Sequence, residues 1–189
     1  MSASLLSGFR AYLRRNLAAG LLTSPFQASA RAWVLLPAYA AVALAIGLGS
    51  GLLRWEPMLT AWAPVMLLAL LVFPSLLEEG LFRGLLIPRQ IRESGLFWTG
   101  LAIAGSTVLY VLWHPLTALM TETQERRLFL APAFLAIVTL LGITCGHNYA
   151  VSKSLWGPIL IHWMTVVVWV FLFGGHNTVL DGLGLTGNR

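Results

Sequence analysis

The stretch LLEEGLFRGLLIP, residues 76–88, carries Glu78, Glu79 and Arg83 at the end of an uncharged run that begins at Pro57. The residues between Glu79 and Pro88 are apolar apart from Arg83, and Pro88 opens a polar connection. Because the residue before a proline is disfavoured in a helix, this pattern predicts a helix that continues past both glutamates and ends near Pro88. The two carboxylates then lie inside a membrane-spanning helix rather than at its flank.

The rest of the chain is similarly apolar. Of its 189 residues, 58% are hydrophobic and 10% are charged, and the mean hydropathy is +0.79. Five stretches contain no charged residue: 32–53, 57–77, 94–121, 128–152 and 154–180. Each can span a bilayer as a helix, which takes about 20 residues, and none shows the alternation of a barrel strand. The sequence predicts an all-α fold, a polytopic transmembrane helix bundle of about five spans with an N-terminal amphipathic helix.

The N-terminal segment combines apolar residues at every fourth position with a separate set of arginines. The apolar residues are Leu5, Phe9, Leu13 and Leu17, and the arginines are Arg10, Arg14 and Arg15. This spacing predicts an amphipathic helix on the lipid surface, with a solvated, disordered tail as the alternative. We therefore divide the chain into an amphipathic surface segment (1–31), a membrane-embedded helical domain (32–175) and a short C-terminal tail (176–189).

The net charge of +5 comes from residues scattered over short connections, so membrane topology explains it better than nucleic-acid binding. Eight of the twelve Lys and Arg residues share one side if the N-terminus is cytoplasmic: Arg10, Arg14, Arg15, Arg31, Arg83, Arg89, Arg92 and Lys153. We expect an integral protein of a bacterial-type cell membrane with its N-terminus in the cytoplasm. The single cysteine, Cys145, excludes an internal disulfide and a Cys-based metal site.

The double glutamate calls for a chemical explanation, because an ionised carboxylate in hydrocarbon costs several kcal/mol unless it is paired or hydrated. Glu79 precedes Arg83 by four residues, the favourable order for an ion pair on one helix face. Glu78 points about 100° away and remains free to take a proton from water. The alternative is a helix that stops at Leu77 and leaves both glutamates as ordinary charges at the membrane interface.

Histidines lie in two other charge-free stretches. A lone histidine such as His114 or His162 is usually a packed, hydrogen-bonded residue of a bundle. Two of them, together with a carboxylate pair on a third helix, predict a convergent polar site. His147 and Asn148 form a further polar pair on the fourth span.

The order of these residues resembles the motifs of the CAAX-protease and bacteriocin-processing (CPBP, or Abi) family of intramembrane glutamic endopeptidases. The motifs are Glu-Glu-x-x-x-Arg at 78–83, an aromatic residue four positions before His114, and a later helix with His162. The resemblance extends over about half of the chain, residues 76–170.

The resemblance implies a protease that hydrolyses a peptide bond of a membrane-associated protein or peptide, without metal or cofactor. Glu78 is expected to activate water as a general base, and His114 to assist and position that water. His162 is expected to donate a hydrogen bond to the oxyanion, an interaction that can contribute several kcal/mol. Glu79 and Arg83 are expected to support the helix rather than to react.

Two features depart from the family pattern. Its third motif commonly reads His-x-x-x-Asn, whereas the fourth residue after His162 is Val166. Either Asn148 replaces the missing donor or His162 acts alone. Counted by helical rise from the cytoplasmic ends, Glu78 and His162 lie about 15 and 13 Å deep, but His114 about 28 Å. Helix tilt, a kink or a later start of the third span has to close that gap; otherwise His147 is the next candidate.

Two other functions fit the same residues. Glu78, His114 and His162 offer oxygen and nitrogen ligands for a zinc-dependent membrane peptidase, although no HExxH motif is present. In a non-catalytic membrane protein, such as a bacteriocin-immunity factor or a partner-binding scaffold, the polar cluster would only hold helices together. Val166 in place of the asparagine makes this non-catalytic alternative a real one, while the endopeptidase remains the leading hypothesis.

Overall fold

The computed structural model describes residues 3–120 and 124–177. Helices make up 80% of the structure, and the described residues include no strand. Four helical stretches are long and apolar enough to cross a bilayer, and a fifth, shorter helix is also apolar: Ala30–Gly49, Ala63–Leu85, Leu96–Ala118, Pro132–Ser152 and Trp156–Leu172. The predicted all-α transmembrane bundle is confirmed.

The outer faces of these helices expose large apolar side chains. Leu68 is 65% exposed, Val108 56% and Leu112 56%. Single exposed apolar residues are ordinary, but rows of them on several long helices are what a lipid-facing surface requires.

The N-terminal segment is helical and precedes the first span. It comprises α1 (Ala3–Leu13), a π-helical turn η1 (Arg14–Ala18), α2 (Ala19–Leu22), and two 3₁₀ turns, η2 (Pro25–Gln27) and η3 (Ala30–Trp33). Helix α3 (Leu36–Gly49) follows. Asn16 and Gly20 are buried, so one side of the segment packs on the membrane domain. The proposed C-terminal tail lies outside the described residues from residue 178 onward.

The second span is helical but not regular. It consists of α4 (Ala63–Leu70), the π-helical turn η4 (Leu71–Leu76), α5 (Leu77–Glu79) and the π-helical turn η5 (Gly80–Leu85). Phe73 leaves the helical region with φ −131° and ψ 121°, next to Pro74, which has no N–H for the Leu70 carbonyl. The hydroxyl of Ser75 donates to that carbonyl instead, at 2.9 Å. The span therefore bends, yet it continues past Glu78 and Glu79, as the sequence predicts.

Helix α8 forms the centre of the bundle. After the short turn η6 (Ile91–Ser94) come α6 (Leu96–Ala118), α7 (Gln124–Phe129), α8 (Pro132–Ser152) and α9 (Trp156–Leu172). Helix α8 packs against α3, α6 and α9. A Cβ at Gly142 would lie 2.8 Å from Thr107, and one at Gly146 2.9 Å from Ile103, so the absence of side chains lets α6 approach. This is the small-residue packing typical of membrane helices.

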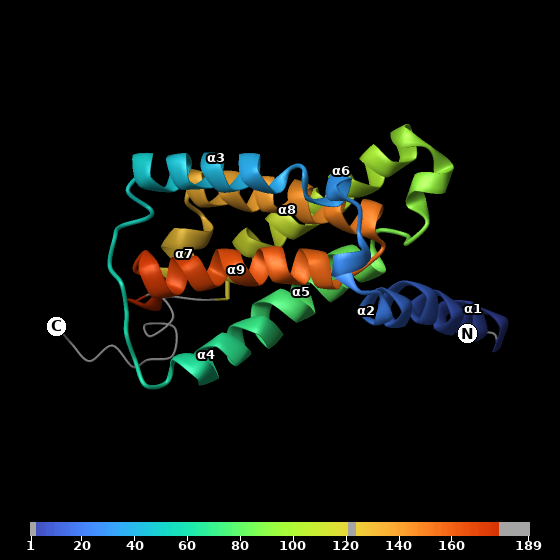
Figure 1. Ribbon diagram of the computed structural model, residues 1–189, viewed down its shortest axis with the longest axis horizontal. Coiled ribbons are helices and arrows are strands. Elements are labelled where there is room, and N and C mark those ends of the chain that lie inside the picture. The colour runs from blue at the N-terminus through green and yellow to red at the C-terminus, as the bar shows by residue number, and fades with distance from the viewer. Residues whose placement is uncertain (1–2, 121–123, 178–189) are drawn as a thin grey trace.

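The chain connections gather at the two ends of the bundle. Figure 1 shows α3, α8 and α9 running side by side, α4 and α5 crossing at an angle, and α1 and α2 at the right end. At that end, Arg89 bonds to the Lys153 carbonyl (3.0 Å) and the Thr23 hydroxyl (2.8 Å). At the other end, the amide of Glu56 donates to the Leu172 carbonyl at 3.0 Å.

Candidate active site

Glu79 and Arg83 form an ion pair at the end of the second span. Glu79 Oε2 lies 3.0 Å from Arg83 Nε, and both side chains have no exposed surface. The two residues are four apart on one helical face, the spacing from which the pair was predicted. The Arg83 guanidinium also lies over the ring of Tyr110, 4.4 Å from its centroid. A buried arginine with a carboxylate and an aromatic face beside it has two sources of compensation for its lost hydration.

His162 lies between the two glutamates. On α9, its Nδ1 is 2.9 Å from Glu79 Oε1, and its Nε2 is 4.0 Å from Glu78 Oε2. The shorter contact joins Nδ1 to the Glu79 carboxylate, which accepts the hydrogen bond. The hydrogen of this bond therefore lies on Nδ1. The ring is thereby held with Nε2 facing Glu78. The second and fifth membrane helices thus meet at one imidazole.

Glu78 differs from Glu79 in its surroundings. Glu79 uses one oxygen for Arg83 and the other for His162, and it has no exposed surface. The Glu78 side chain is 13% exposed, and its Oε2 has no hydrogen-bond partner among the described residues. Trp113 lies beside this carboxylate. Of the two glutamates, Glu78 is the one with a carboxylate oxygen, Oε2, that no described residue bonds.

His114 joins the group through Tyr110. Both lie on α6, and the Tyr110 ring centroid is 5.1 Å from the ring of His114 and 6.0 Å from that of His162. His114 Nδ1 bonds to the carbonyl of Tyr110 at 3.0 Å. No hydrogen bond or ion pair joins His114 to Glu78 within the described part of the chain. Within the described residues, His114 is therefore linked to His162 through the ring of Tyr110 rather than by a direct bond to Glu78.

His147 and Asn148 bond to the chain just before α3. His147 Nε2 bonds to the Arg31 carbonyl at 2.9 Å, and the Asn148 amide donates to the Ala32 carbonyl at 3.1 Å. A Cβ at Gly157 would collide with the Asn148 side chain, so Asn148 also packs closely on α9. In this arrangement both side chains connect helices.

Two further residues line the site without having been assigned a role from the sequence. In the sequence, Tyr110 is the aromatic residue four positions before His114, and in the structure its ring contacts Arg83, His114 and His162. Cys145 is fully buried and lies beside Glu79 and Arg83. The helical spacing of Tyr110 and His114 could have indicated that Tyr110 faces the site. A lone cysteine in an apolar stretch gives no such indication for Cys145.

The described residues include no group of three or more His, Cys, Asp or Glu side chains arranged to hold a metal ion. His162 has two carboxylate neighbours, but one of them is already paired with Arg83. No arrangement in this part of the chain favours the zinc-dependent alternative.

Comparison with known proteins adds one finding. A protein-family model described as type II CAAX prenyl endopeptidase Rce1-like matches residues 60–168, more than half of the chain. The matched region includes all the residues that meet around Tyr110 and His162. Comparisons with curated proteins and with solved structures found no match.

Proposed function

The chain belongs to the Rce1-like family of type II CAAX prenyl endopeptidases, and we propose that Glu78 activates the water with which it hydrolyses a peptide bond. The family and the apolar helices make it an integral membrane protein of a protease family. The substrate we propose is a membrane-associated protein or peptide. The observation that carries the mechanism is the position of His162, held by Glu79 at one ring nitrogen and facing Glu78 with the other.

The first step needs a base with an unoccupied oxygen. Glu78 meets this requirement, whereas Glu79 is neutralised by Arg83 and bonded to His162. Glu78 therefore takes a proton from a water molecule as the water oxygen attacks the peptide carbonyl.

The attack leaves a negative charge on the former carbonyl oxygen. His162 Nε2 lies 4.0 Å from Glu78, so a carbonyl carbon attacked by water at Glu78 brings its oxygen within reach of that nitrogen. To donate there, Nε2 must carry a hydrogen in addition to the one on Nδ1. A positioned donor in a dry site stabilises an oxyanion far more than it could in water.

The second step returns the proton. When the tetrahedral intermediate collapses, the carbon–nitrogen bond breaks, and Glu78 gives the proton from water to the leaving amine. The products are a carboxylic acid and an amine, which ionise in water to a carboxylate and an ammonium group, and Glu78 is restored. His114 bonds to backbone through Nδ1, so Nε2 is the nitrogen with which it can help to orient the water.

The test is Glu78→Gln in purified full-length protein reconstituted into lipid nanodiscs with a fluorescence-quenched, prenylated reporter peptide. The amide keeps the shape of the side chain but cannot take a proton, so we expect the cleavage rate to fall by about 10²–10⁴-fold. Glu56→Gln is the matched control, because that carboxylate is 54% exposed and lies at the opposite end of the bundle.

Cleavage at the normal rate by a folded Glu78→Gln protein rules out the proposed base. Absence of cleavage in the unsubstituted protein, with a membrane function that survives both Glu78→Gln and His114→Ala, favours the non-catalytic scaffold. Stoichiometric zinc whose removal by a chelator abolishes cleavage favours the metal-dependent mechanism instead.

A further inference from the structure

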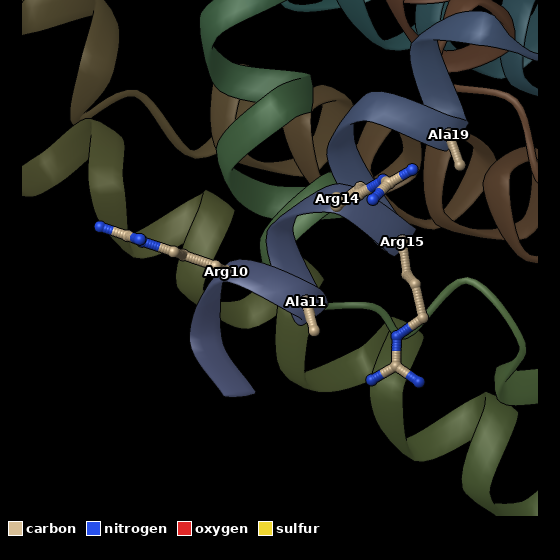
Figure 2. Close-up of a pocket in the computed structure, with 5 residues that line it drawn as sticks. All are labelled: Arg10, Ala11, Arg14, Arg15 and Ala19. Atoms are coloured by element: carbon tan, nitrogen blue, oxygen red, sulfur yellow. The ribbon is translucent and has the colours of Figure 1, made fainter. Parts of the chain in front are cut away.

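The N-terminal segment has a basic side that the proposed hydrolysis does not use. Arg10, Arg14 and Arg15 line a shallow, open cleft together with Ala11 and Ala19. Figure 2 shows the three arginine side chains extending from α1 and η1 in different directions, away from one another. All three residues are exposed.

The other side of the segment is bonded to the membrane domain. The Tyr12 hydroxyl donates to the Leu85 carbonyl at 2.7 Å, and the Asn16 side chain accepts from the Arg89 amide at 2.9 Å. Arg10 precedes Tyr12 by two residues and Arg14 follows it by two, so each arginine points about 200° around the helix from Tyr12. The docking therefore leaves both arginines on the outward side.

The charge of this outward side is not neutralised nearby. Glu93, on the connection at the same end of the bundle, is already paired with Lys153 at 3.1 Å. None of the three arginines has an ion-pair partner within the described residues. Three uncompensated cations on one short helix require an anionic partner or full hydration.

The geometry indicates which anionic partner fits. Guanidinium groups that diverge cannot enclose one phosphate, but they can each contact a different phosphate in a plane. The segment also exposes large apolar residues that suit the boundary between headgroups and acyl chains: Phe9 is 57% exposed, Leu22 88% and Phe26 89%. We propose that the exposed arginines Arg10, Arg14 and Arg15 bind the headgroups of anionic phospholipids and hold α1 on the membrane surface.

The test measures the position of α1 in the full-length protein. Ala11→Cys, exposed in the cleft, is labelled with a fluorophore; the only native cysteine, Cys145, is buried. The protein is placed in nanodiscs of phosphatidylcholine with increasing phosphatidylglycerol, and a nitroxide on the phosphatidylcholine headgroup quenches the fluorophore. We expect quenching to rise with the fraction of phosphatidylglycerol and to be reversed by high salt, because the attraction is between charges near the surface.

The variant Arg10→Gln/Arg14→Gln/Arg15→Gln should lower the equilibrium constant for the quenched position about 100-fold, or about fivefold for each arginine. The matched control is Arg126→Gln/Arg127→Gln on α7, which should change nothing. Glutamine has a helix propensity close to that of arginine, so the triple substitution should leave the segment helical. The salt titration tests the same attraction in the unsubstituted protein and needs no variant.

Three outcomes overturn the proposal. The first is equal quenching with and without phosphatidylglycerol, and the second is quenching that neither salt nor the triple substitution changes. The third is loss of the phosphatidylglycerol effect when millimolar glycerol phosphate is added, which would indicate a site for a single soluble anion. None depends on catalysis, so failure here leaves the proposed hydrolysis untouched.

Discussion

Adjacent glutamates acquire different properties in this bundle because one helical step separates their directions. Glu79 faces the bundle interior, where Arg83 and His162 take both of its oxygens. Glu78 lies about 100° around the helix; its side chain is partly exposed, and its Oε2 has no partner among the described residues. A protein can place a reactive carboxylate in a membrane if the neighbouring one stabilises the helix and orients the partner side chain. In our proposal, Glu79 acts through His162 and is a positioning residue.

At the same scale, we predict that the ring of Tyr110 positions the site and that its hydroxyl does not. The ring lies against Arg83, His114 and His162, so Tyr110→Phe should retain cleavage within about twofold of the unsubstituted rate. Tyr110→Leu removes the aromatic face. The cation–π contact of that face with Arg83 alone contributes about 0.5–2 kcal/mol. We expect kcat for the reporter peptide to fall at least tenfold while KM stays nearly constant.

The Tyr110 prediction separates a positioning role from a merely structural one. Thermal unfolding of both variants in nanodiscs provides the control, since lost packing alone would lower stability without a selective effect on kcat. Equal loss of kcat in the phenylalanine and leucine variants would assign the role to the hydroxyl and contradict the prediction.

At the scale of elements, the spans could be predicted because a bilayer imposes length and apolarity on each helix. The continuation of the second span past Glu78 also followed from the apolar residues before Pro88. The bend at Phe73 did not, because it depends on how Ser75 satisfies a carbonyl that Pro74 leaves free. The contact of His162 with Glu79 was not predicted either, because it depends on the rotation of α9 relative to α5, and a sequence pattern does not encode that rotation.

The packing of α6 on α8 supports a second prediction. A Cβ at Gly146 meets Ile103 at 2.9 Å, whereas one at Gly105 on α6 meets nothing within 4 Å. Gly146→Ala should therefore destabilise the bundle by about 1–3 kcal/mol through overpacking. Gly105→Ala should be neutral or stabilise by up to about 1 kcal/mol, because alanine favours the helix.

The measurement for the glycine pair is unfolding of the reconstituted protein by a denaturing detergent, with helicity as the readout. The two substitutions are chemically identical, so their difference reports the space at each position. If Gly146→Ala proves as stable as Gly105→Ala, the α6–α8 interface is looser than the structure indicates.

At the scale of the whole molecule, the polar connections fall into two groups at opposite ends. One end combines the N-terminal segment, the connection around Arg89 and the turn at Lys153, which are bonded to one another. The other end includes the chain from α3 to α4, which bonds to the end of α9. Most of the Lys and Arg residues outside the spans lie at the first end, and positively charged connections favour the cytoplasm.

We therefore predict that the end with the N-terminal segment is cytoplasmic. Two single-cysteine probes test this: Ser94→Cys at the first end, and Leu59→Cys, where the native side chain is 99% exposed, at the second. In intact bacterial cells expressing the protein, a membrane-impermeant maleimide should label position 59 and should reach position 94 only after permeabilisation. Cys145 is buried and provides the unlabelled background. The reverse pattern would place Glu78 and His162 closer to the outer face, because both lie nearer the first end, and the substrate would then have to approach from outside the cell.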